Sequence, residues 1–137
     1  MLHKTVVALV DDLFWRAKIE HAVRSAQAGV VFVSDPAELA GAAPAESVGV
    51  LLADLALKKD PFPALAAWRK GASTREIPVY AYFEHVRKDL KEKADALGLA
   101  GVLPRSSFAE RLADIVLEHA LPGGVRTASE EPELPEE

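Results

Sequence analysis

Five short apolar runs between residues 5 and 103 constrain the fold of this chain more than any other feature. They are rich in valine, leucine and alanine, and longer amphipathic stretches separate them. The runs are Thr5–Val10, Gly29–Val33, Val48–Leu52, Pro78–Tyr82 and Gly101–Leu103. Continuous apolarity over a short run is typical of parallel strands that are covered on both faces. The runs therefore predict a five-stranded parallel sheet.

The stretches between the runs have the spacing of helices. Leu13–Gln27 carries Trp15, Ile19 and Val23 at helical spacing, with most of its charged residues elsewhere on the helix. Four further helices are predicted. They are Pro36–Ala40, Phe62–Lys70, Val86–Leu97 and Phe108–Ala120.

Three helix ends carry recognisable signals. Asp35 followed by Pro36 is typical of an N-cap with proline at the first helical position. Gly98 is typical of a helix C-cap, and Ser107 with Glu110 has the spacing of a capping box. These signals place the boundaries of three of the predicted helices.

Alternating strands and helices imply right-handed crossovers and a doubly wound sheet. The predicted fold class is α/β, flavodoxin-like (βα)5, with a five-stranded parallel sheet in the order 2-1-3-4-5. Ligands of such sheets bind outside the carboxyl ends of the strands, where the order switches between the first and third strands.

Acidic residues stand at that switch. Asp11 and Asp12 directly follow the first run, and Asp54 directly follows the third. If these runs are neighbouring parallel strands, the three carboxylates meet in one pocket. Such a pocket can hold a hard cation such as Mg²⁺, and one carboxylate can accept a phosphoryl group.

Length and composition limit the number of domains and the kinds of site that the chain can contain. A chain of 137 residues is the usual size of one domain, here predicted as residues 1–120. The segment 121–137 carries five glutamates against one arginine and is predicted to be an acidic, disordered tail. The absence of cysteine excludes disulfides, thiolate catalysis and the usual structural zinc sites.

Charge and hydropathy exclude two classes of partner. The net charge of −5 comes mostly from the tail, so the chain lacks the basic surface of a nucleic-acid binder. No stretch approaches the ~20 apolar residues of a membrane span, and the start of the chain lacks the apolar segment of a signal peptide. A soluble, cytoplasmic protein is expected.

The motifs resemble the receiver domain of two-component response regulators over residues 3 to 120. Lys4–Asp12 looks like the first strand of that family with its acidic pair, and Val50–Leu57 looks like the third strand with the phosphoacceptor aspartate. Ile77–His85 is similar to the fourth strand, and Gly101–Ser106 is similar to the fifth.

The resemblance implies roles for the acidic residues. Asp12 and Asp54 would be metal ligands, with Asp11 in support, and the metal would be Mg²⁺. Asp54 would be the nucleophile that accepts a phosphoryl group from a phosphohistidine.

Two positions depart from the family. Receivers have a small Thr or Ser at the end of the fourth strand, where this chain aligns Phe83. An alignment shifted by one residue puts Tyr82 or Glu84 there, and neither restores Thr or Ser. Receivers also have Lys followed by Pro, where this chain has Arg105 and Ser106. The guanidinium of arginine is wider than the ammonium of lysine.

These departures suggest how the charge of the pocket is balanced. Arg105 is predicted to bridge Asp54 bidentately and to hold the site in one neutral arrangement without phosphate. Lys58 and Lys59, just past Asp54, can neutralise the pocket in a similar way. The departures predict a degenerate or pseudo-receiver, with Phe83 as the strongest argument.

Three functions follow from these features. The first is a receiver-like signal-transduction module that acts through protein contact, with weak, atypical or absent phosphorylation of Asp54. The alternative is an ordinary Mg²⁺-dependent phosphorylatable receiver in a phosphorelay. The third is a small-molecule binder or enzyme on the same fold. The sequence argues against this function, because it contains neither G-x-G-x-x-G nor G-x-x-x-x-G-K-[ST], the two glycine-rich nucleotide-binding motifs.

The predicted partners follow from the first two functions. They are a histidine kinase, an output protein, or a second copy of the chain docked through the fourth helix, fifth strand and fifth helix. At most, the domain would catalyse its own phosphorylation and would not be an enzyme in the usual sense.

Overall fold

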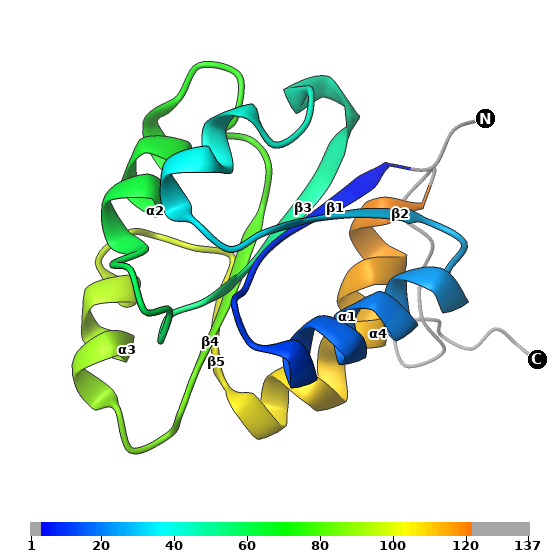
Figure 1. The fold of residues 1–137 in the computed structure, drawn as a ribbon. Coiled ribbons are helices and arrows are strands. Elements are labelled where there is room, and N and C mark those ends of the chain that lie inside the picture. The colour runs from blue at the N-terminus through cyan, green and yellow to red at the C-terminus, as the bar shows by residue number, and fades with distance from the viewer. Residues whose placement is uncertain (1–3, 122–137) are drawn as a thin grey trace, which may run out of the picture.

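Five parallel strands form one sheet in the order β2-β1-β3-β4-β5 (Figure 1). This computed structural model describes residues 4–121. The strands are β1 (Thr5–Leu9), β2 (Gly29–Val33), β3 (Val48–Asp54), β4 (Val79–Phe83) and β5 (Gly101–Pro104). The predicted flavodoxin-like, doubly wound fold is confirmed, and each strand lies within one or two residues of its predicted position.

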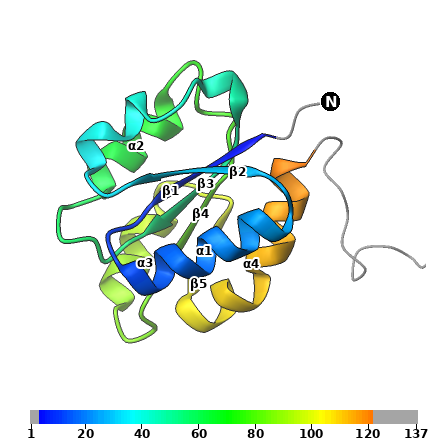
Figure 2. The same cartoon turned by 45° about the vertical axis from the view of Figure 1, so that its right-hand side comes forward.

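Helices cover both faces of the sheet. The α-helices are α1 (Leu13–Ser25), α2 (Phe62–Lys70), α3 (Lys88–Asp95) and α4 (Arg105–Ala120). Two 3₁₀ helices, η1 (Pro36–Gly41) and η2 (Ala45–Ser47), connect β2 to β3. The helices α1 and α4 lie side by side on one face, whereas η1, α2 and α3 lie on the other (Figures 1 and 2).

The predicted α-helix at 36–40 is a 3₁₀ helix instead. The N–H of Glu38 donates to the carbonyl of Asp35 (2.9 Å) and the N–H of Ala42 to that of Leu39 (3.2 Å), which is the i to i+3 pattern. The predicted N-cap is confirmed, because Oδ1 of Asp35 accepts from the N–H of Ala37 (3.0 Å). The segment therefore begins where predicted and is wound more tightly.

The start of α4 differs from the prediction. Strand β5 runs directly into the helix, which begins at Arg105, and Pro104 occupies the N-cap without a side-chain hydrogen bond. Ser107 therefore lies inside the first turn, and the predicted capping box with Glu110 is wrong. The predicted helix 86–97 is shorter at both ends. Its C-cap is Ala96, so the predicted cap at Gly98 lies two residues too far along the chain, in a turn where Gly98 has a φ of +70°.

Two hydrophobic clusters make up the core, one on each face of the sheet. Beneath α1 and α4 the cluster includes Ile19, Leu52, Tyr82, Phe108 and Ile115. Beneath η1, α2 and α3 it includes Leu39, Leu51, Leu65, Trp68 and Phe83. All seven residues of β3 are buried, because this strand lies in the middle of the sheet. The strand that ends in Asp54 is thus buried along its whole length.

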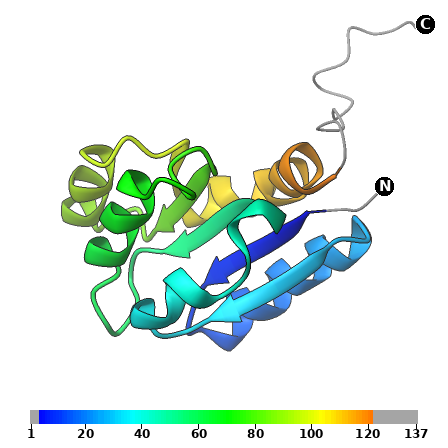
Figure 3. The same cartoon turned by 90° about the horizontal axis from the view of Figure 1, so that it is seen from above.

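The start of β1 and the end of α4 lie side by side (Figure 3). The N–H of Lys4 donates to the carbonyl of Ala120 at 2.7 Å. Apart from Leu121, the predicted tail 121–137 lies outside the described residues, so its disorder stays a prediction. Among residues 4–121, none of the helices combines the length and apolarity needed to cross a bilayer.

Candidate functional site

The acidic residues lie at the carboxyl edge of the sheet, where β1 and β3 are neighbours. Leu9 pairs with Ala53 across these strands, so the chain passes Asp11 and Asp12 just beyond the edge where Asp54 ends β3. Both Asp11 and Asp12 act electrostatically on Asp54. The three side chains predicted to meet are therefore near one another.

Asp12 is the N-cap of α1. Its backbone is extended (φ −107°, ψ 124°), and Oδ1 accepts from the N–H groups of Phe14 (2.7 Å) and Trp15 (3.3 Å). These two donors would otherwise have no partner in the first turn of the helix. One oxygen of Asp12 thus has a structural role.

Asp11 and Asp54 also accept from backbone N–H groups. Oδ2 of Asp11 accepts from the N–H of Lys58 (3.0 Å), which ties the loop after β1 to the loop after β3. Oδ1 of Asp54 accepts from the N–H of Ala56 (2.8 Å) in the turn that follows β3. Each of the three carboxylates therefore stabilises a loop or a helix start.

These carboxylates are suitable metal ligands but do not form a complete cage of side chains. Mg²⁺ requires near-octahedral oxygen ligands, for which carboxylates are suitable donors. Within the described range 4–121, however, no three acidic or histidine side chains are grouped closely enough to hold a metal. Mg²⁺ keeps several waters and is usually bound through only one or two carboxylates, so the magnesium site at Asp11, Asp12 and Asp54 stays a prediction.

Burial dominates the chemistry of Asp54. Its exposed fraction is 2%, and it is the one charged side chain among the buried residues of the described chain. Burial raises the pKa of the Asp54 carboxyl above its ordinary value. The hydrogen bond from Ala56 and the charge of Arg105 act in the opposite direction without cancelling this effect.

Asp54→Asn is expected to raise the free energy of unfolding at neutral pH by about 1 kcal/mol, because asparagine is a neutral isostere of a buried carboxylate. The pKa of Asp54 is higher in the folded state than in the unfolded state. The stability that its neutral carboxyl contributes is therefore fully present when the pH is below the unfolded-state pKa. That stability is lost as the pH rises through the folded-state pKa. The gain from the substitution should therefore shrink as the pH falls toward 3.8, which urea unfolding of both proteins measures.

Asp35→Asn is the matched control for this prediction. The hydrogen bond from Lys59 lowers the pKa of Asp35, so its carboxylate is favoured in the folded state and its neutralisation should bring no gain at neutral pH. A wild-type protein at least as stable as the Asp54→Asn variant at neutral pH would contradict a destabilising charge at Asp54.

The predicted bidentate bridge between Arg105 and Asp54 is wrong. Nη1 of Arg105 lies 3.6 Å from Oε2 of Glu84, and Nε is buried without a hydrogen-bond partner among the described residues. The physical reason is the strand order: Arg105 follows β5, and β4 with its following Glu84 lies between β5 and β3. Arg105 acts on Asp54 only through its charge.

The two lysines after β3 do not pair with Asp54 either. Nζ of Lys59 lies 2.9 Å from Oδ2 of Asp35, at the start of η1. Lys58 contributes its backbone N–H to Asp11. The Lys59 side chain therefore pairs with Asp35, after β2, rather than with the buried aspartate.

Phe83 is part of the hydrophobic core beneath α2 and α3. Its exposed fraction is 3%, and it ends β4 in register with Pro104 of β5. A phenyl ring at this position offers no hydrogen bond. The ring belongs to the cluster on the face opposite to that of Tyr82.

Tyr82 is the site residue that sequence reasoning missed, since it entered only as a shifted alignment. It pairs with Asp54 across β3 and β4, and its ring lies 4.7 Å from that of Trp15 and 4.5 Å from that of Phe108. Its hydroxyl is buried without a hydrogen-bond partner among the described residues. Only the register between β3 and β4 shows that Tyr82 lies beside Asp54, and the sequence does not specify that register.

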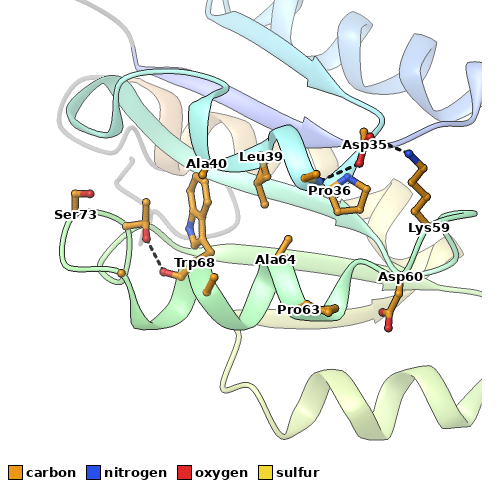
Figure 4. Close-up of a pocket in the computed structure, with 14 residues that line it drawn as sticks. Asp35, Pro36, Leu39, Ala40, Lys59, Asp60, Pro63, Ala64, Trp68 and Ser73 are labelled. Carbon is orange, nitrogen blue, oxygen red and sulfur yellow. Dashed lines mark hydrogen bonds and ion pairs between the residues drawn. The ribbon is translucent and has the colours of Figure 1, made fainter.

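A separate groove, which Asp11, Asp12 and Asp54 do not line, lies between η1 and α2 (Figure 4). Its volume is about 660 Å³, and its walls include Leu39, Ala64 and Trp68, with the Asp35–Lys59 ion pair at one end. The groove exists because a short 3₁₀ segment, and not a full helix, covers this part of the sheet. It was not predicted from the sequence.

Comparisons with known proteins give the fold. No protein-family model and no curated protein matches the chain. Among solved structures, the phosphorylated cyanobacterial phytochrome response regulator RcpA superposes with a TM-score of 0.73 at 22% identity, over 88% of this chain and 99% of that one.

Two further solved structures agree. The chemotaxis response regulator CheY4 of Vibrio cholerae has a TM-score of 0.66 at 22% identity, over 82% of this chain and 93% of that one. The receiver domain of the sensor histidine kinase PA1611 from Pseudomonas aeruginosa, with magnesium in its active-site cleft, has a TM-score of 0.65 at 21% identity, over 80% and 93%. The chain has the fold of response-regulator receiver domains.

Proposed function

We infer that this chain is a receiver-like signalling module that acts through contact with other proteins, and that phosphorylation of Asp54 is weak, atypical or absent. The observation that carries this proposal is the burial of Asp54 at the end of β3, with an exposed fraction of 2%. The fold supports the signalling role, and the details of the site support the loss of phosphoryl chemistry.

A phosphoacceptor carboxylate must be ionised and must be reached by its donor. Burial opposes both requirements, because it raises the pKa of Asp54 and shields its oxygens from a second protein. The neighbouring positions add to this effect. Phe83 has no hydroxyl to meet a phosphoryl group, and Arg105 pairs with Glu84.

The alternative is an ordinary phosphorylatable receiver. RcpA is a phosphorylated response regulator, and the receiver of PA1611 holds magnesium. In favour of this alternative, the present chain has carboxylates at the same edge of the same fold. Against it, residues 4–121 contain no group of three acidic or histidine side chains that could hold a metal, and Asp54 is buried.

The proposed docking face consists of α3, β5 and α4, which correspond to the fourth helix, fifth strand and fifth helix of the sequence prediction. The charged side chains of α3 are exposed and pair with one another, as in Lys91 with Asp95 (2.6 Å). Exposed pairs of this kind contribute little to stability, so they are free to exchange for pairs with a partner. A histidine kinase, an output protein and a second copy remain the proposed partners.

A small-molecule binder is the second candidate. The groove between η1 and α2 has the volume of a ligand site, for which about 300–1,000 Å³ is typical. It ranks lower because the one ion pair along its wall, between Asp35 and Lys59, is already formed.

An amide-resolved NMR titration with Mg²⁺ and then beryllofluoride tests the proposal. Beryllofluoride mimics a phosphoryl group on a carboxylate. The amide signals of Asp54, Ala56 and Arg105 are expected to stay unchanged, because the carboxylate of Asp54 is buried.

The Asp54→Asn variant is the control, since it removes the acceptor and keeps the shape of the side chain. Shifts in the wild type that disappear in this variant would establish a working receiver and refute the proposal. Shifts that persist in the variant would report binding elsewhere on the surface and leave the proposal standing.

A further inference from the structure

Tyr82 stands directly beside Asp54 in the sheet. The two residues are paired across β3 and β4, and Tyr82 is fully buried, with an exposed fraction of 0%. It belongs to the cluster beneath α1 and α4, as does Leu52 two residues before Asp54. Because side chains alternate along a strand, Asp54 and Tyr82 start from the same face of the sheet.

Two helices hold the ring of Tyr82 in place. Phe108 of α4 stacks on it, with ring centroids 4.5 Å apart and planes at 25°, and Trp15 of α1 packs against it at 4.7 Å. Trp15 and Phe108 are themselves 5.7 Å apart, so the three rings form a closed triangle. Tyr82 cannot swing aside without a change in this packing.

The hydroxyl end of Tyr82 lies among the charged residues of the candidate site. Burial raises the pKa of the phenol most strongly, and the carboxylate of Asp54 raises it further. The charges of Arg105, Asp12 and Asp11 also act on the hydroxyl. The four side chains that a receiver site would use are therefore close enough to act electrostatically on this one oxygen.

Two buried polar atoms near the site have no hydrogen-bond partner among residues 4–121. The Tyr82 oxygen and Nε of Arg105 are both buried without a hydrogen bond to any described residue. A buried polar group without a partner destabilises a fold, and phenylalanine would fill the same packing without that cost. The hydroxyl is thus an obstacle at the pocket rather than part of a bonding network.

We propose that Tyr82 closes the acidic pocket, because its ring and hydroxyl fill the space beside Asp54 that a divalent cation and a phosphoryl group would need. The inference rests on the proposed function and gives its cause: the acidic residues are all present, and one aromatic side chain excludes their ligands. Tyr82 acts on the site by position and takes no part in any reaction.

The test compares Tyr82→Val, which shortens the side chain, with the wild type in the Mg²⁺ and beryllofluoride NMR titration. The shortened variant is expected to bind Mg²⁺ at least about tenfold more tightly, with shifts at Asp54 and Ala56 that disappear when Asp54→Asn is added. Tyr80→Phe is the matched control, because Tyr80 is in the same strand and cluster at its far end. It should bind no better than the wild type.

Tyr82→Leu, which keeps more of the buried volume, replaces Tyr82→Val if that variant does not fold. A folded variant at Tyr82 that still shows no response would overturn the closure by Tyr82 and leave the proposed function intact. A wild type that already responds at Asp54 would overturn both. A response in the shortened variant alone supports both.

Discussion

Phe83→Thr is expected to lower the free energy of unfolding by about 3 kcal/mol and to leave Asp54 unresponsive to Mg²⁺ and beryllofluoride. Phe83 is almost completely buried in the core beneath α2 and α3, so the change removes a large ring and leaves a cavity. It also places a hydroxyl in an apolar cluster. Restoring the residue type that receivers have at this position should therefore damage the fold without restoring the site.

Phe83→Leu is the control, since it keeps an apolar side chain and should cost clearly less. Urea unfolding gives the stability of both variants, and the NMR titration gives the response of Asp54. A stable Phe83→Thr protein that binds beryllofluoride would show that this side chain alone blocks the site. That outcome would contradict the assignment of the ring to the core.

Phe108→Ala is expected to lower the free energy of unfolding by about 3–5 kcal/mol. The ring is fully buried and is shared between Tyr82 of β4 and Trp15 of α1, so its loss opens a cavity where the sheet and two helices meet. The same variant frees one face of the Tyr82 ring. Chemical unfolding followed by far-UV circular dichroism measures the change.

Ser107→Ala is the matched control for Phe108→Ala, because Ser107 is the preceding residue of α4 and is not an N-cap. Its stability should stay within about 0.5 kcal/mol of the wild type. A small effect at Phe108 would mean that the aromatic triangle is not an important part of the core, and a large effect at Ser107 would restore the capping box that the structure lacks.

Local patterns in the sequence were sufficient for the architecture. Strand β3 is a continuous apolar run because it is covered on both faces, and α1 shows the helical spacing of Trp15, Ile19 and Val23 because only one side of it is buried. The N-cap at Asp35 was also readable, since it depends on the side chain of that residue.

Local patterns failed where neighbours in space decide the outcome. The capping signal at Ser107 was overridden because β5 continues without a loop into α4. The bridge from Arg105 to Asp54 was wrong because a strand lies between them, which brings Glu84 closer to the guanidinium. Both errors come from the packing of elements and not from the composition of either segment.

The sequence by itself determined the α/β class and placed Asp11, Asp12 and Asp54 directly after two of the strands, because periodicity and residue position specify these features. The strand order was predicted by analogy with flavodoxin-like folds, since doubly wound sheets occur in more than one order. The tertiary structure decided how exposed the acidic residues are and which side chains lie beside them. It buried Asp54, placed Phe83 in one core cluster and brought Tyr82 against the acidic residues from the other. Burial and strand register are properties of the folded chain, since they depend on residues that are far apart in sequence.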